Sequence, residues 1–185
     1  MKRVAVVVSL ALFIYSSCTN KNTYNEIENN EKRANYLLKF ADKVRGHNQE
    51  ASFRLSKQAL ELSEDNKLTK AKSYYLMGYA QRILIEDDFG LQNFRKALHI
   101  SSKIENDTLK ANCLFNLGAL YKYKTDYKKA LEYFYKSLEI RKEIGNPANI
   151  GSTYASIGAI FRRYDDFQKA IKYFYDGVRE YEKAD

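Results

Sequence analysis

Apolar residues recur at spacings of three and four along most of the chain after residue 30. Residues so spaced lie on one face of an α-helix, so the pattern predicts amphipathic helices. The clearest region has two apolar stripes, one formed by Leu114, Leu117, Leu120 and Tyr121 and the other by Tyr127, Leu131, Phe134 and Leu138. Only a short polar segment, 124–126, separates the two stripes. Two helices joined by so short a turn are expected to pack antiparallel.

The helix pair repeats with a period of 40 residues. The aligned positions include Gly78, Gly118 and Gly158, then Phe94, Phe134 and Phe174, and then Asn66, Asn106 and Asn146. A fixed period of this size indicates a stacked repeat array. A glycine inside a helix costs about 1 kcal/mol relative to alanine. Its recurrence at one place predicts a close approach of the partner helix there.

Helix boundaries can also be predicted. Gly145 suits a left-handed helix end, Asn146 suits the cap of the next helix, and Pro147 suits its first turn. Asp126 is expected to cap the helix that follows the polar turn. These local signals agree with the apolar period, which strengthens the prediction of helix pairs.

The motif Leu114-x-x-Leu117-Gly118-x-x-Tyr121, followed by Ala130-x-x-x-Phe134, resembles a tetratricopeptide repeat. The next unit matches equally well, with Tyr154-x-x-Ile157-Gly158-x-x-Phe161 and Ala170-x-x-x-Phe174. The preceding unit keeps Gly78 and Phe94 but has Gln81 and Gly90 at two motif positions. Residues 67–185 thus form three such units, and residues 31–66 a degenerate first helix pair. The resemblance implies an all-α, right-handed superhelical array of about four antiparallel helix pairs.

The N-terminus is typical of an exported protein. Lys2 and Arg3 precede a largely apolar run of 12 residues from Val4 to Tyr15, too short to span a bilayer, which needs about 20 residues. The small residues before Cys18 resemble a bacterial lipoprotein signal. We therefore expect a signal peptide over 1–17, a lipidated Cys18, and a flexible tether over 18–30. The alternative is an ordinary signal peptide in which Cys18 carries no lipid. The resemblance to lipoprotein sorting, with Thr19 after the cysteine, favours the outer membrane over the inner one.

The charge balance narrows the class of partner. The 31 basic and 23 acidic residues give a net charge of +8, and loss of Lys2 and Arg3 would leave 29 against 23, or +6. A basic excess often suggests nucleic acid, but the export signal argues against such a partner. Lipid headgroups or an acidic peptide remain as candidate partners for the basic surface. Cys113 is the one cysteine besides Cys18. It has no partner for an intramolecular disulfide if Cys18 carries a lipid or is removed, so we do not expect a disulfide scaffold. Cys113 is expected to pack as a small apolar residue.

The sequence offers no catalytic constellation. Its two histidines, His47 and His99, stand apart, and no paired metal-ligand motif or phosphate-binding glycine loop is found. The acidic cluster 86–88 lies at a predicted helix junction, where acidic residues commonly interact with a helix N-terminus. We therefore expect a binding protein with no cofactor and no metal, and not an enzyme.

The resemblance implies a concave groove lined by the first helix of each pair. The predicted groove residues are Tyr75, Tyr79, Arg82, Asn112, Phe115, Ala119, Lys122, Ser152, Ala155, Ala159 and Arg162. This surface suits a peptide with apolar side chains and some acidic character. The alternative is that Tyr75, Tyr79 and Phe115 pack between neighbouring units. Tyr75 and Tyr79 also stand where the carboxylate-clamp members of the family have lysine and asparagine, so that activity is not predicted.

The apolar residues of the last predicted helix indicate a second binding surface. Its apolar residues are Phe167, Ile171, Phe174, Tyr175, Val178 and Tyr181. A large bare apolar patch usually marks a partner. A homodimer or another protein could cover this patch, or the chain could be the front part of a longer regulator. Two functions therefore stay open, a lipid-anchored adaptor and an extracytoplasmic sensory module of a longer signalling protein or complex.

Overall fold

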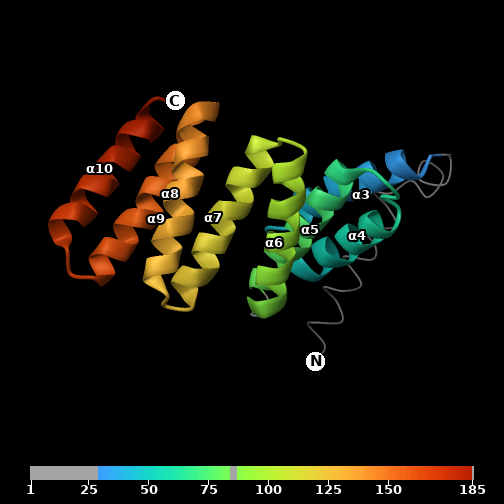
Figure 1. Ribbon diagram of the computed structural model, residues 1–185, viewed down its shortest axis with the longest axis horizontal. Helices are drawn as coiled ribbons and strands as arrows, with labels where there is room; N and C mark the ends of the chain where they lie inside the picture. Colours follow the sequence, from blue (N-terminus) through green and yellow to red (C-terminus); the bar gives the residue numbers. More distant parts are fainter. Residues whose placement is uncertain (1–28, 84–86, 185) are drawn as a thin grey trace.

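The computed structural model describes residues 29–83 and 87–184, and the predicted signal peptide, Cys18 and the tether up to residue 28 lie outside this range. Within the described residues the chain forms eight α-helices and no strand (Figure 1). The helices are α3 (Asn30–Val44), α4 (Gln49–Glu61), α5 (Lys67–Ile83), α6 (Asp87–Lys103), α7 (Asp107–Tyr123), α8 (Tyr127–Ile144), α9 (Pro147–Arg163) and α10 (Phe167–Glu182). The expected all-α array of four antiparallel helix pairs is confirmed.

The predicted helix ends are confirmed. The side-chain oxygen of Asn106 accepts a hydrogen bond from the Leu109 amide at 2.9 Å, and Asp126 caps α8 in the same way. Gly145 ends α8 with a φ of 76°, in the left-handed region that favours glycine. Asn146 caps α9, and Pro147 occupies its first turn. Each N-cap side chain accepts a hydrogen bond from a backbone N–H group that has no partner within the helix.

The pairs stack into two layers. The first helices contact one another directly, α3 with α5, α5 with α7 and α7 with α9, whereas the second helices contact one another less closely. The layer with the closer contacts must lie on the inside of the curve. The concave face therefore belongs to α3, α5, α7 and α9, and the successive pairs run from α3 at one end to α10 at the other (Figure 1).

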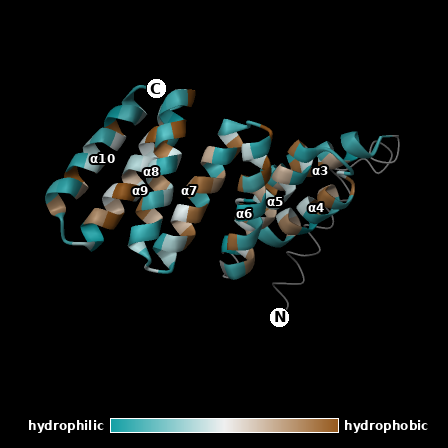
Figure 2. Cartoon of the chain, in the orientation of Figure 1, coloured by the Kyte–Doolittle hydropathy of each residue, from teal (hydrophilic) through white to brown (hydrophobic). Residues whose placement is uncertain are grey.

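Each glycine of the repeat allows one tight contact within its pair. Phe94 and Phe134 are fully buried, and each lies against the glycine of the preceding helix. A Cβ atom built on Gly118 would lie 2.8 Å from the Phe134 ring, and one on Gly78 would lie 3.1 Å from Phe94. The expected close approach is confirmed. Each helix carries both apolar and polar residues, as an amphipathic helix should (Figure 2).

The helices are too short or too polar to cross a membrane, as far as the described residues show.

We predict opposite effects for the same substitution at two glycines. Gly118→Ala should destabilise the protein by about 1–3 kcal/mol, because the new methyl group overlaps the buried Phe134 ring. Gly90→Ala should stabilise it by up to about 1 kcal/mol, because the nearest atom would be 3.4 Å away and alanine favours the helix. Chemical denaturation of both variants measures this. Equal effects would contradict the account of helix pairing.

Candidate functional site

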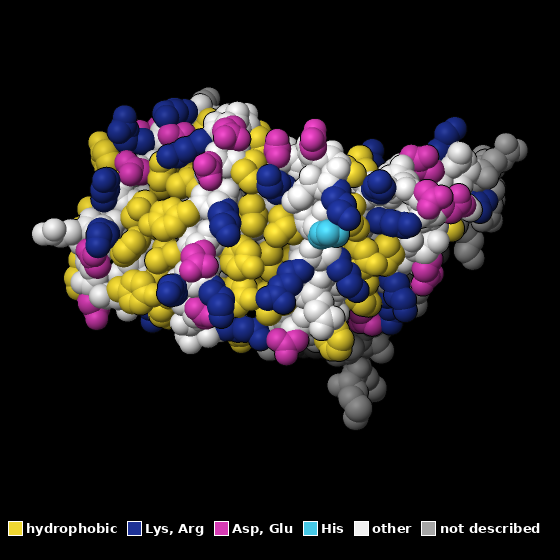
Figure 3. Space-filling model, viewed as in Figure 1, with side chains coloured by type: hydrophobic (Ala, Val, Ile, Leu, Met, Phe, Trp, Pro, Cys, Tyr) yellow, Lys and Arg dark blue, Asp and Glu magenta, His cyan; other side chains and the backbone are white. Residues whose placement is uncertain are grey.

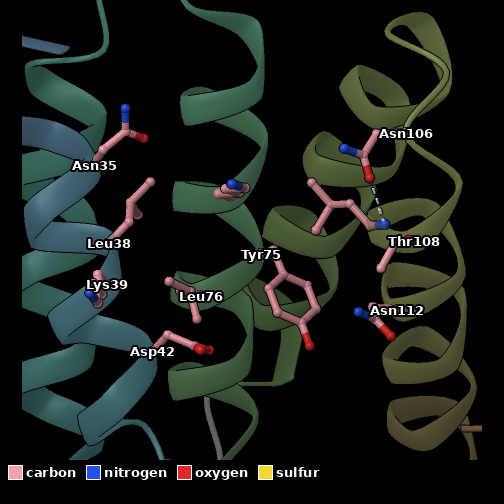
Figure 4. Close-up of a pocket in the computed structure, with 11 residues that line it drawn as sticks. Asn35, Leu38, Lys39, Asp42, Tyr75, Leu76, Asn106, Thr108 and Asn112 are labelled. Carbon is pink, nitrogen blue, oxygen red and sulfur yellow. Dashed lines mark hydrogen bonds between the residues drawn. The ribbon is translucent and has the colours of Figure 1, made fainter. Parts of the chain in front are cut away.

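The concave face is hollowed where α3, α5 and α7 meet. The hollow has a volume of about 560 Å³. Figure 4 shows its side chains converging from the three helices. The lining residues are Asn35, Leu38, Lys39, Asp42, Lys72, Tyr75, Leu76, Asn106, Thr108, Leu109 and Asn112. Two of the predicted groove residues, Tyr75 and Asn112, are therefore brought together here.

Tyr75 has one part in the core and one part in the hollow. Its ring packs against Phe94, with ring centres 5.8 Å apart. Its hydroxyl lies 3.4 Å from an Arg45 nitrogen and 3.5 Å from the Asn116 amide nitrogen, both long for hydrogen bonds. Burial raises the pKa of Tyr75, so the hydroxyl keeps its proton at neutral pH. Tyr75 was expected either to line the groove or to pack inside the array. Its ring packs and its hydroxyl end lines the hollow.

Tyr79 is held by two cations. The guanidinium carbon of Arg45 lies 4.8 Å from the centre of the Tyr79 ring, and that of Arg82 lies 5.0 Å from it. Such contacts are favourable because the face of an aromatic ring is electron-rich. Arg45 also pairs with Asp42 at 2.9 Å. The predicted residues Tyr79 and Arg82 thus lie in one cluster with Arg45, which the sequence analysis missed.

Arg141 of α8 reaches the floor of the groove from the second layer. It is only 5% exposed. Its guanidinium donates to the Asn112 side chain at 3.1 Å and to Thr153 at 2.7 Å, and it lies 4.4 Å from the centre of the Phe115 ring. Burial lowers the pKa of Arg141 to about 10, so it remains protonated at neutral pH. No carboxylate pairs with it among the described residues.

Three cations, Arg82 among them, lie at the ends of the inner helices. Arg82, Lys122 and Arg163 stand in or next to the last turns of α5, α7 and α9, and we call them the basic row. Lys122 is half-buried. Its pKa is lowered by this burial and by the nearby charges of Arg82 and Arg163. The predicted residue Arg162 and its neighbour Arg163 are both exposed, and the charge of Arg163 acts on Lys122.

Most of the other predicted groove residues are small and leave space in the groove. Ala119, Ala155 and Ala159 are half-buried on the inner helices. The Ser152 hydroxyl donates to the Asn149 carbonyl at 2.9 Å and lies 3.3 Å from an Arg141 nitrogen. Small side chains at these positions keep the groove open along α7 and α9.

The last helix carries a second apolar surface, which we call the α10 face. Its exposed residues are Phe167, Ile171, Tyr175, Val178 and Tyr181. Val178 is 52% exposed, while Leu138, at the same place in the preceding unit, is only 6% exposed. Hydrophobic side chains gather over this end of the molecule (Figure 3). Phe174, predicted for this surface, is half-buried instead, because its ring packs against Gly158.

Neither a cluster of metal-ligating side chains nor a reactive thiol is found in the part of the chain that the structure covers. No group of three or more histidine, cysteine, aspartate or glutamate side chains there could hold a metal ion. Cys113 is buried, and burial raises its thiol pKa, so it is present as the unreactive thiol. The prediction that Cys113 packs as an apolar residue is confirmed.

A model of a known protein family matches the chain. The tetratricopeptide repeat profile matches residues 69–143 and 123–183, which together are more than half of the chain. Among curated proteins, no sequence matches this one.

Solved structures share the architecture. Aspartyl phosphate phosphatase F from Bacillus subtilis superposes with a TM-score of 0.79 at 18% identity, over 85% of this chain and 42% of that one. A Rap protein complexed with competence and sporulation factor gives 0.79 at 18% identity, over 86% and 46%. MamA gives 0.64 at 22% identity, over 89% and 85%. This chain thus spans less than half the length of the first two proteins, and the likeness establishes the fold.

Proposed function

The chain belongs to the tetratricopeptide repeat family, and we propose that it is a non-catalytic scaffold that binds a protein or peptide in its concave groove. The observation that carries this proposal is the hollow across α3, α5 and α7. Three successive inner helices supply its walls, so one ligand would contact several repeat units at once. Binding sites are typically concave, with an apolar lining and a few placed polar groups.

The lining suits a peptide backbone. The amide oxygen of Asn112 accepts from Arg141, which turns the amide nitrogen toward Tyr75 as a donor (Figure 4). Asn35 supplies a second amide on the opposite wall, from α3. Leu38 and Leu76 lie between them and offer apolar contact. Amides that face one another across an apolar floor match an extended chain, which presents N–H and C=O groups and apolar side chains together.

One similar structure supports this use of the fold. The Rap protein named above was solved complexed with competence and sporulation factor. At 18% identity that likeness carries no residue roles to this chain. The support is that an array of this shape accommodates a separate ligand.

We predict that filling the hollow abolishes binding. Peptides selected by the full chain from a random display library should bind Thr108→Trp at least roughly ten-fold more weakly, because the indole would occupy space next to Asn112. Gln92→Trp is the matched control, because Gln92 is exposed on the second-layer helix α6. Fluorescence anisotropy measures both. Selected peptides that bind both variants alike would place the ligand elsewhere.

We propose that the chain is exported and held at the cell envelope by a lipid on Cys18. The support is the sequence alone, a charged and then apolar leader that ends in small residues before the cysteine. Acyl chains would hold the groove near the membrane surface, each adding about 0.8 kcal/mol per buried methylene. The alternative is a sensory module of a longer signalling protein or complex, in which the same groove would detect a ligand outside the cytoplasm.

Lipidation has a direct test. In a bacterial host fed labelled palmitate, the chain should take up label and sediment with membranes, and Cys18→Ser should do neither. Cys113→Ser is the control, because Cys113 is buried in the helical array and should leave labelling unchanged. Label that persists in Cys18→Ser would overturn the proposed anchor.

The α10 face supports a second function, self-association. Val178 stands where the preceding unit has Leu138, which is buried in the array. A second copy that covered this face would remove the exposed Ile171 and Val178 side chains from water.

We predict that the full chain forms a dimer whose mass by light scattering rises with concentration. Ile171→Glu should shift it to the monomer, because Ile171 is 67% exposed on the α10 face. Ile144→Glu should not, because Ile144 is exposed at the end of α8. A wild-type chain that stays monomeric at every concentration would exclude this association.

A further inference from the structure

One edge of the array is basic. The turns within the last two pairs, α7–α8 and α9–α10, lie at the same edge, opposite the end of α10 (Figure 1). We call residues 122–129 and 162–169, which form these turns and the helix ends beside them, the turn edge. The first segment has four lysines and one aspartate, and the second has three basic residues and two aspartates.

The opposite edge lacks this excess of positive charge. Residues 102–109 and 142–149 surround the turns between successive pairs, and together they have two basic and three acidic residues. Toward the N-terminus the turn edge is limited by the acidic residues 86–88, which precede the bulk of α6. The basic edge is thus a property of the last two pairs.

Helix ends account for only some of these cations. A cation in a last turn is stabilised by the partial negative charge of the helix C-terminus. Lys128, Lys129 and Lys169 instead stand in the first turns of α8 and α10, where positive charge is disfavoured and no acidic residue is present. Four of the seven cations form no ion pair within the ranges that the structure describes, namely Lys122, Lys128, Arg162 and Arg163. The fold itself therefore does not require this much positive charge here.

Exposed aromatic rings stand among the cations. Tyr123 is 64% exposed, Tyr164 50% and Phe167 58%. The Tyr164 ring meets the Tyr127 ring edge-on, with centres 5.6 Å apart, and this contact joins the two turns. At the turns between pairs, the large exposed apolar side chains among the described residues are aliphatic, Leu68 and Ile144. Basic and aromatic side chains are thus combined at one edge and not at the other.

An anionic bilayer surface matches this combination better than a nucleic acid does. Aromatic side chains are enriched at the level of lipid headgroups, and lysine and arginine side chains are attracted to anionic lipids. A single-stranded nucleic acid binds in a groove that follows its backbone. The turn edge is the outer end of two helix pairs, and the hollow across α3, α5 and α7 includes none of its residues.

We infer that the turn edge docks on the surface of an anionic phospholipid bilayer, with Tyr123, Tyr164 and Phe167 among the headgroups and the neighbouring cations against lipid phosphates. The inference depends neither on a ligand in the concave groove nor on the lipid proposed for Cys18. Contact of this kind is reversible and weakened by salt. A chain without lipid is therefore still expected to leave the membrane fraction when cells are broken and diluted.

Sedimentation with vesicles tests the role of charge. The full chain with Cys18→Ser, which cannot be lipidated, should partition at least roughly ten-fold more strongly onto vesicles that contain phosphatidylglycerol than onto phosphatidylcholine vesicles. This preference should shrink at high salt. All variants below share this background and the same N-terminus, so differences between them come from the substituted residues.

Two double variants with the same change in net charge locate the effect. Lys128→Glu with Arg163→Glu should weaken partitioning onto the anionic vesicles at least roughly ten-fold. Lys103→Glu with Arg179→Glu should change it less than about two-fold, because these exposed residues lie in the last turns of α6 and α10, at the opposite edge. Circular dichroism should show the same helix content in both, since all four side chains are exposed.

A fluorescent probe tests the aromatic contact without changing any charge. The chain has no tryptophan, so a single one reports on its own position. The emission of Tyr123→Trp should shift to shorter wavelength on anionic vesicles and be quenched by lipids that are brominated on their acyl chains. Ile144→Trp should show neither change, because Ile144 is exposed at the opposite edge.

Four results would overturn the inference. These are equal partitioning onto anionic and neutral vesicles, equal losses in the two double variants, equal quenching of the two tryptophans, or displacement of the chain from vesicles by a single-stranded oligonucleotide. The last result would assign the turn edge to nucleic acid. Each of them would leave the peptide-binding groove and the lipid on Cys18 untouched, because those are tested by other variants.

Discussion

The contact between a glycine of the first helix and an aromatic ring of the second fixes the geometry of each pair. At Gly118 there is no room for a methyl group, because the Phe134 ring is fully buried and lies 2.8 Å from where a Cβ would be. Gly78 and Gly158 make the same contact with Phe94 and Phe174. Three pairs closed in the same way have nearly the same shape, so they stack in register. The concave face exists because the first helices of these equal units contact one another directly.

The helix-capping residues and the period of the apolar pattern were enough to predict this architecture. The 40-residue offset, the asparagine caps and Gly145 are properties of neighbouring residues, and each determines a local geometry that the structure contains. The groove was harder to predict, because its floor includes Arg141, a residue of the second layer. Nothing in the spacing of α8 shows that this arginine crosses to Asn112 on α7.

Arg141 and the basic row differ from the paired cations of the molecule in how their charge is compensated. Lysines of the second-layer helices and turns pair with nearby carboxylates, as Lys129 does with Asp126. Such exposed pairs contribute little to stability, about 0–1 kcal/mol. On the inner face Arg141 and the basic row have neutral partners or none among the described residues. The cost of burying Arg141 is offset only in part by neutral oxygens and the Phe115 ring. The groove is consequently the surface at which an anionic ligand would gain most.

The central claim is that a partner binds the concave face formed by α3, α5 and α7. Hydrogen–deuterium exchange of the full chain, with and without a selected peptide, tests it most directly. The account predicts slower exchange in the first turns of α7 and in the part of α5 around Tyr75, with α10 unchanged. Protection confined to α10, with no change in the inner helices, would contradict it.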